Sequence, residues 1–246
     1  ATAAELGLAF DTFVLGGDTS EGTALRVSCV GLGSVPAGGA IRRVGLRPGD
    51  RLFASGLLGA GAALAAAKLL RLPGIGITED DFAPPSRIAH GRALRRIASA
   101  CIDTSDGLFA AVDQLARLND VAIHLDANLA GFLEPSAARV RRVLGLGGGF
   151  PLLASMHGEF ELVFGVPPDR LHDLDRVARV LAWQPVPLGQ VREGQGLRVG
   201  VVPVDGARVR NLHHECGGEI ERYVTALVLM AREIDREAAR HSPDWT

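Results

Sequence analysis

Short apolar segments alternate with amphipathic segments along most of this 246-residue chain. The apolar segments, such as 52–55, 121–126 and 161–166, have the length and the residue types of strands. The amphipathic segments, such as 107–118 and 170–182, place apolar residues three or four positions apart, as a helix that buries one face does. Strands that alternate with helices are typical of α/β and α+β proteins. The sequence therefore predicts mixed sheets with flanking helices.

Other segments complete this expected organisation. The segment 24–32 alternates apolar and polar residues, which predicts a half-exposed strand. Ser86 stands where it would cap a helix, and the segments 33–50 and 73–85 contain the prolines of a connector and a loop. We also expect strands over 10–15, 101–103, 186–191 and 197–202, and helices over 60–71, 86–99, 134–144 and 219–240.

The charge balance argues against one large class of partner. The chain has 26 basic and 28 acidic residues, for a formal net charge of −2. Binding to a nucleic acid through bulk charge needs clustered cations, so we expect no nucleic-acid partner.

The apolar stretch 52–70 is interrupted by Lys68 and falls short of the roughly 20 residues of a membrane span. Lys68 is also the only lysine, so any chemistry that needs a lysine must use this one.

The cysteines and methionines give two further expectations. Cys29, Cys101 and Cys216 lie far apart, which favours free thiols in a reducing, cytoplasmic setting. No basic and then apolar leader opens the sequence. The chain begins at Ala1 and has methionine only at 156 and 230, so we expect that an N-terminal portion is missing.

Several familiar nucleotide and catalytic motifs are absent from the sequence. There is no GxxxxGK[ST] loop, no strand–GxGxxG–helix fingerprint, no GxSxG elbow and no HExxH helix. Three acidic turns remain as candidates for chemistry, and each also has a purely structural interpretation.

The first acidic turn is 16–20 (GGDTS). Its glycines would let a phosphate approach the backbone, and Asp18 could hold a hard cation. Taken alone, a capped β-turn is favoured about two to one. In the second turn, 103–107 (DTSDG), two carboxylates three residues apart suit a Mg²⁺–phosphate site, and ordinary helix capping is about as probable. The third turn, 158–161 (GEFE), precedes a strand and adds another acidic pair, and its structural interpretation is a solvated turn.

A fourth cluster, 213–216 (HHEC), has the residue types of metal ligands. Neighbouring residues rarely converge on one ion, so we give a metal site roughly one chance in ten and favour a polar turn.

The order of the motifs strengthens the three acidic turns. GGDTS (16–20) is followed by RVGLRPGD (43–50), GLLG (56–59), PSR (85–87), IDTSDGL (102–108) and GEFEL (158–162). In this order and spacing they resemble the thiamine-monophosphate kinases of the AIR synthase-like superfamily. The resemblance covers about three quarters of the chain, and IDTSDGL and RxGxxPGD are its most specific parts.

The resemblance implies a fold, an activity and partners. It implies an AIR synthase-like two-domain fold with an incomplete N-terminal domain over 1–40, a C-terminal α/β domain over 41–210 and a helical extension over 211–246. It implies a cytoplasmic, homodimeric kinase of thiamine biosynthesis that uses ATP and Mg²⁺ to phosphorylate a phosphate group on a small molecule. Two alternatives stay open, an ATP-dependent ligase or cyclase of the same superfamily and a non-catalytic nucleotide-binding homologue.

Carried over position by position, the resemblance also implies roles for single residues. Asp18 and Asp106 would be catalytic, and Asp18, Asp103 and Asp106 would bind Mg²⁺. ATP would contact Gly17, Asp18, Arg43 and Ser105. The acceptor would contact His157, Glu159 and Phe160, in a stretch where the family has Gly-Glu-Asp-Tyr-Glu-Leu, so the identity of the acceptor stays open.

Overall fold

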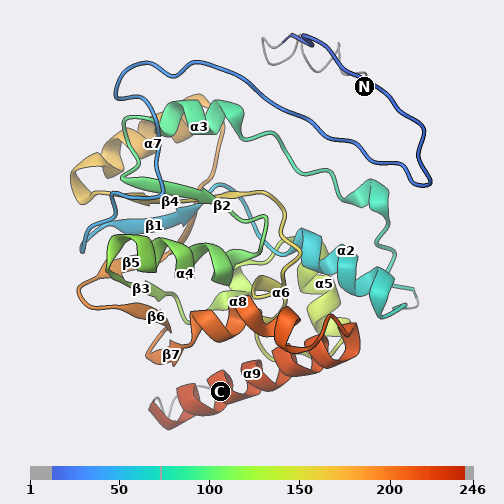
Figure 1. The fold of residues 1–246 in the computed structure, drawn as a ribbon. Helices are drawn as coiled ribbons and strands as arrows, with labels where there is room; N and C mark the ends of the chain where they lie inside the picture. Colours follow the sequence, from blue (N-terminus) through green and yellow to red (C-terminus); the bar gives the residue numbers. More distant parts are fainter. Residues whose placement is uncertain (1–12, 73, 242–246) are drawn as a thin grey trace. The chain divides into compact units, whose positions relative to one another are not determined.

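The computed structural model describes residues 13–72 and 74–241 (Figure 1). The chain divides into two units, Ala1–Val35 and Pro36–Thr246. The described part of the first unit, residues 13–35, contains no helix or strand. The strand predicted over 24–32 is therefore wrong. Leu25 is 95% exposed, and a strand needs a neighbour for its backbone hydrogen bonds, which the described residues of this unit do not provide.

The strand predicted over 10–15 falls partly outside the described residues. Residues 13–15, which are described, form no strand.

In the described part of the second unit, seven strands form one mixed sheet. Their order is β2-β4-β1-β5-β3-β6-β7. Only the pair β3–β6 is parallel, and the other neighbouring strands are antiparallel. The bounds are β1 Arg51–Ala54, β2 Ala100–Asp103, β3 Ala122–Leu125, β4 Leu162–Val166, β5 Val186–Arg192, β6 Gly196–Val199 and β7 Val202–Val204.

Helices cover both faces of this sheet (Figure 1). On one face α3 and α7 enclose a small core with β4, and on the other face the remaining helices enclose a larger core. The helices are α2 Ala60–Leu69, α3 Ile88–Leu94, α4 Leu108–Asn119, α5 Pro135–Val143, α6 Phe150–Leu153, α7 Leu171–Val180, α8 Gly206–Glu215 and α9 Ile220–His241. Short 3₁₀ turns occupy Glu79–Asp81, Leu129–Phe132 and Pro168–Arg170.

The larger core joins the C-terminal helices to the sheet. Phe109 of α4 meets Phe150 of α6 edge to face, with ring centroids 4.6 Å apart. Tyr223, Leu227 and Met230 of α9 are buried in the same cluster. Each such apolar side chain stabilises the fold by about 1.5–3 kcal/mol through burial. Val209 and Leu212 of α8 belong to the same cluster, so α8 and α9 both pack on the core that contains α4 and α6.

Most of the elements predicted for the second unit are confirmed, with five corrections. The strand expected over 197–202 is two strands, β6 and β7, with a turn between them at residues 200 and 201. Arg87, not Ser86, is the residue before α3, and it makes no capping bond through its side chain. That helix ends at Leu94 rather than near residue 99. The polar turn expected at 213–216 is wrong, because His213 to Glu215 are the last residues of α8. The short helix α6 was not predicted.

Three observations concern the expectations from composition. Lys68 forms a surface ion pair with Glu79, with Nζ and Oε1 3.0 Å apart. Cys29, Cys101 and Cys216 form no disulfide. Among the residues that the structure describes, no helix is long and apolar enough to cross a membrane.

Candidate functional site

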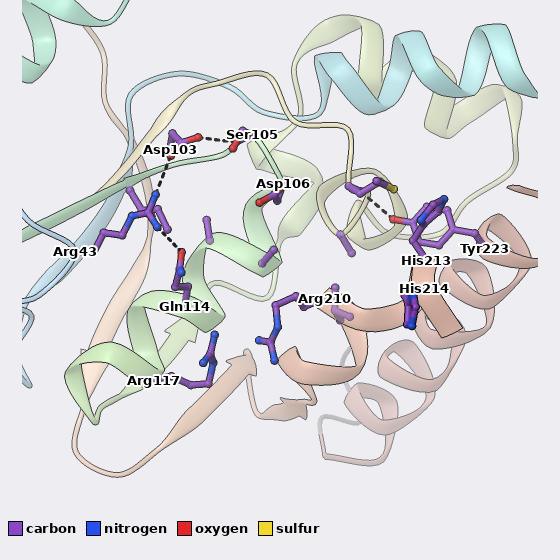
Figure 2. A pocket seen from close by; sticks show the side chains of 16 residues that line it. Arg43, Asp103, Ser105, Asp106, Gln114, Arg117, Arg210, His213, His214 and Tyr223 are labelled. Atoms are coloured by element: carbon purple, nitrogen blue, oxygen red, sulfur yellow. Dashed lines mark hydrogen bonds and ion pairs between the residues drawn. The ribbon is translucent and has the colours of Figure 1, made fainter. Parts of the chain in front are cut away.

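A cavity of about 420 Å³ lies beside the C-terminal end of β2, within the second unit. Its walls come from the segment before β1, from β2 and α4, and from the helices α8 and α9 (Figure 2). The polar side chains that line it are those of Arg43, Asp103, Ser105, Asp106, Gln114, Arg117, Arg210, His213, His214 and Tyr223.

The acidic residues reach this cavity through the turn between β2 and α4. Asp103 is the last residue of β2 and stands opposite Leu162 of β4. The chain then turns, with the amide of Gly107 donating to the carbonyl of Thr104 at 2.9 Å, and α4 begins at Leu108. Asp106 is therefore exposed directly before the N-terminus of α4, where the helix dipole favours negative charge.

Arg43 reaches the cavity because its segment runs along the free edge of β2. The amide of Cys101 donates to the carbonyl of Arg42 at 2.9 Å. The side chain of Asn119, at the end of α4, donates to the carbonyl of Arg43 at 2.9 Å. The guanidinium of Arg43 donates to Gln114 Oε1 at 3.1 Å and lies 3.7 Å from Asp103 Oδ1 (Figure 2).

The surroundings of Asp103 favour its charged form. Partial burial alone would raise the pKa of this carboxyl. Hydrogen bonds from Ser105, whose amide lies 3.3 Å from Asp103 Oδ2, and the charge of Arg43 outweigh that effect. The pKa of Asp103 therefore lies below its ordinary value, and the group is an anion at neutral pH.

The structure thus brings together four of the residues singled out in the sequence, namely Arg43, Asp103, Ser105 and Asp106. The described part of the chain contains no cluster of three or more acidic, histidine or cysteine side chains that could hold a metal ion. Two carboxylates nevertheless suit Mg²⁺, which is commonly bound through one or two carboxylates together with phosphate oxygens. Asp103 and Asp106 fit that pattern.

The opposite side of the cavity carries two arginines that were not predicted. Arg117 of α4 and Arg210 of α8 both contact the buried carboxylate of Asp113, on α4. His213 and His214 follow on α8. His213 and His214 belong to the HHEC cluster noted in the sequence, but no motif marks the two arginines. Their only local signal is the spacing of four between Asp113 and Arg117, which is common in surface helices.

The third acidic turn has a structural role. Glu159 is 6% exposed and accepts hydrogen bonds from the amide of Gly59 at 2.7 Å and from the hydroxyl of Thr104 at 3.0 Å. Its burial raises the pKa of its carboxyl to about 7, against the lowering effect of these bonds. Glu161 is 3% exposed and forms a bidentate ion pair with Arg87, at 2.6 and 2.7 Å, and a hydrogen bond with Ser55.

None of the three predicted substrate contacts lines the cavity of Asp103 and Asp106. Glu159 is buried behind it, Phe160 is 54% exposed with a left-handed φ of 63°, and His157 lines a separate apolar cavity of about 50 Å³. Burial, and then the charge of His213, lower the pKa of His157. A role for these three residues in acceptor binding stays a prediction.

Gly17 and Asp18 belong to the first unit, where both are exposed. The amide of Thr19 donates to Asp18 Oδ1 at 2.8 Å, as in a local turn. Their contribution to a phosphate or metal site also stays a prediction.

Comparisons with known proteins bear on this site. No protein-family model matches the chain. The thiamine-monophosphate kinase of Salmonella typhimurium is 34% identical over 166 residues, which are 64% of this chain and 49% of that protein. This chain is similar to the thiamine-monophosphate kinases. It spans about half the length of the curated relatives that it matches.

Solved structures extend the similarity to the fold. The thiamine-monophosphate kinase of Stenotrophomonas maltophilia superposes with a TM-score of 0.59 at 26% identity, over 69% of this chain and 56% of that one. HypE of E. coli, a hydrogenase maturation protein, has a TM-score of 0.52 at 25% identity, over 67% and 51%. AaThiL complexed with AMPPCP and TMP has a TM-score of 0.52 at 24% identity, over 67% of this chain and 52% of that one. At this identity the similarity supports a shared fold and nothing further. The predicted resemblance to thiamine-monophosphate kinases and the predicted AIR synthase-like fold are confirmed.

Proposed function

We propose that this protein is an ATP- and Mg²⁺-dependent phosphotransferase that acts like the thiamine-monophosphate kinases. It would transfer the γ-phosphoryl group of ATP to the phosphate of a small phosphorylated acceptor. One observation carries the proposal: Arg43, from the segment before β1, and Asp103, Ser105 and Asp106, from the turn between β2 and α4, line one cavity in a chain similar to these kinases.

The chemistry asks for positioning and charge neutralisation rather than for a covalent intermediate. An oxygen of the acceptor phosphate forms a bond to the γ-phosphorus, the bond from that phosphorus to the bridging oxygen breaks, and ADP leaves. Mg²⁺, held by Asp103 and Asp106 together with phosphate oxygens, would neutralise the charge on the phosphates. Arg43 and the hydroxyl of Ser105 would orient the nucleotide, so the scarcity of lysine is no obstacle.

The remaining parts of the expected enzyme belong to the same proposal. Gly17 and Asp18 would add to the phosphate and metal site. His157, Glu159 and Phe160 would act on the acceptor side. The domain division at residues 40 and 210, the homodimer, the cytoplasmic location and the absence of a nucleic-acid partner complete the proposal.

The test is a product assay on the purified protein with ATP, Mg²⁺ and thiamine monophosphate. We expect thiamine diphosphate and ADP in equal amounts. Asp106→Asn should lower the rate at least 100-fold, because it removes a charge at the metal site. Asp80→Asn, an exposed acid outside the cavity, is the matched control and should keep the wild-type rate. No diphosphate at saturating Mg²⁺, or an unchanged rate in Asp106→Asn, would overturn the proposal.

A further inference from the structure

We infer that Arg117 and Arg210 form a second anion-binding subsite in the same cavity, and that it takes the phosphate-monoester group of the acceptor. The two guanidinium groups line the cavity together with Asp103 and Asp106. Figure 2 shows both of them away from Asp103 and Ser105, on the side formed by α4 and α8. That the anion is an acceptor rests on the proposed function, whereas the anion subsite itself does not.

A single buried carboxylate holds the two arginines together. Asp113 is 8% exposed, and its Oδ2 accepts a hydrogen bond from Arg117 Nε at 3.0 Å. The same oxygen accepts from Nη1 of Arg210, which comes from the other helix. The shared oxygen therefore holds two guanidinium groups close together, although the two arginines lie 93 positions apart in the sequence.

This arrangement leaves positive charge and hydrogen-bond donors for a ligand. Two guanidinium groups and one carboxylate give a net charge of +1. Each guanidinium has five N–H donors in a planar fork that matches phosphate geometry. Among the contacts of the described residues, Arg117 uses Nε and Arg210 uses Nη1, so the other N–H groups have no protein acceptor there.

A glycine at the start of α8 allows this close contact. A Cβ on Gly206 would lie 2.4 Å from Asp113 Oδ1 and 2.7 Å from Asp113 Cβ, which is too near for any side chain. The first turn of α8 therefore touches the acid directly, and Arg210 follows one turn later, over the cavity. By contrast Arg208, on the same helix, makes an ordinary surface ion pair with Glu233 at 3.3 Å, with both side chains about half exposed.

Charge explains why the acceptor would bind on this side. Transfer between two phosphates brings two multiply charged anions together, so each needs its own neutralising group. Asp103 and Asp106 suit a metal-bound nucleotide and would repel a bare phosphate. Arg117 and Arg210 suit the bare phosphate. The cavity of about 420 Å³ lies within the usual range for small-molecule sites.

The test measures two affinities in the same set of variants. Binding of thiamine monophosphate and of inorganic phosphate is measured with the nucleotide site filled by saturating Mg²⁺ and AMPPCP, and AMPPCP binding is measured separately. Arg210→Gln and Arg117→Gln should each weaken phosphate binding at least 10-fold and change AMPPCP affinity less than twofold. Arg208→Gln, the matched control on α8, should change neither affinity.

A second substitution guards against a folding defect. Arg210→Lys keeps the charge and the contact with Asp113, so it should recover part of the lost phosphate affinity at a wild-type melting temperature. Wild-type phosphate affinity in Arg210→Gln, or equal loss of phosphate and AMPPCP binding in that variant, would overturn the subsite. If phosphate binding depends on Arg210 while no diphosphate product forms, the subsite stands and the proposed phosphotransferase falls.

Discussion

The two acidic motifs of the second unit look alike in sequence and differ in the folded chain. Each places two carboxylates next to a strand, β2 for Asp103 and Asp106 and β4 for Glu159 and Glu161, and these strands are neighbours. The first pair opens into the cavity, where the Asp103 side chain is 39% exposed. The second pair is at most 6% exposed. Burial and the available hydrogen-bond donors, not the residue type, decide which acids can meet a ligand.

The turn of the buried pair, Glu159 and Glu161, is bonded to the turn of the open pair, Asp103 and Asp106. The amide of Thr104 donates to the carbonyl of Glu161 at 2.8 Å, and the amide of Gly158 donates to the carbonyl of Ser105 at 3.1 Å. The two turns are therefore tied to each other through their backbones. Four substitutions test whether one pair maintains the fold while the other binds a ligand.

The largest effect is expected from Glu161→Gln. It leaves Arg87, whose side chain is 18% exposed, without its charged partner, and breaking a buried ion pair costs about 3 kcal/mol or more. The same acid-to-amide change at Asp106 should alter the free energy of unfolding by less than about 0.5 kcal/mol. Urea unfolding of the two variants measures both values, and equal losses would remove the distinction between the motifs.

Gly158→Ala should damage both motifs at once. A Cβ at this position would lie 1.5 Å from the carbonyl oxygen of Thr104, so the turn that carries Ser105 must move. We expect a loss of about 2 kcal/mol in the free energy of unfolding, together with weaker AMPPCP binding. Gly74→Ala is a control, since a Cβ there meets no atom within 4 Å, although its φ of 70° adds a local cost. Unchanged nucleotide affinity in Gly158→Ala would show that the two turns are independent.

Glu159→Gln should change how stability depends on pH. Burial raises the folded pKa of Glu159 to about 7, from an ordinary value of 4.5. The folded state therefore binds more protons than the unfolded state between these values, and this group's contribution to stability is lost as pH rises from about 4.5 to 7. The amide cannot ionise, so the variant should gain on the order of 1 kcal/mol relative to the wild type across that range. Chemical unfolding at several pH values measures the difference, with Glu193→Gln as an exposed control. A difference that does not vary with pH would contradict the effect.

Asp103→Asn should give the smallest effect, with the opposite pH dependence. The folded pKa of Asp103 is lowered, so its contribution to stability is present above about pH 4 and is lost as pH falls through the lower folded value. Because the group is more than one-third exposed, the loss in the variant should stay below about 1 kcal/mol. The two unfolding curves should coincide in strong acid. A larger loss at low pH than at neutral pH would show that another group is responsible.

The sequence predicted the elements of the second unit well because their apolar periodicity is strong. The helix α8 was missed because it has only two buried apolar side chains, Val209 and Leu212, among polar neighbours. The strand expected over 24–32 was wrong because alternation describes a strand's two faces but cannot supply a neighbouring strand. A pattern within one segment cannot show what lies beside that segment.

For the same reason, the sequence predicted the acidic side of the cavity but not the two arginines on the other side. Asp103, Ser105 and Asp106 lie within one turn, so a single motif identified them. Arg117 and Arg210 meet only through Asp113, on a contact between two helices far apart in sequence. Nothing in the sequence distinguished the open acids from the buried ones, because exposure depends on the packing of β2 against β4.

Helix α4 positions both acidic and cationic groups of the cavity. Asp106 precedes its first turn, Asp113 and Arg117 lie along it, and Asn119 at its end fixes the segment of Arg43. The spacing between the acidic and the cationic groups is therefore set by helix pitch and is insensitive to loop movements. Substitutions on α8 could retune the proposed acceptor side while the nucleotide side stays intact, so related proteins could acquire new acceptors without rebuilding the machinery of transfer.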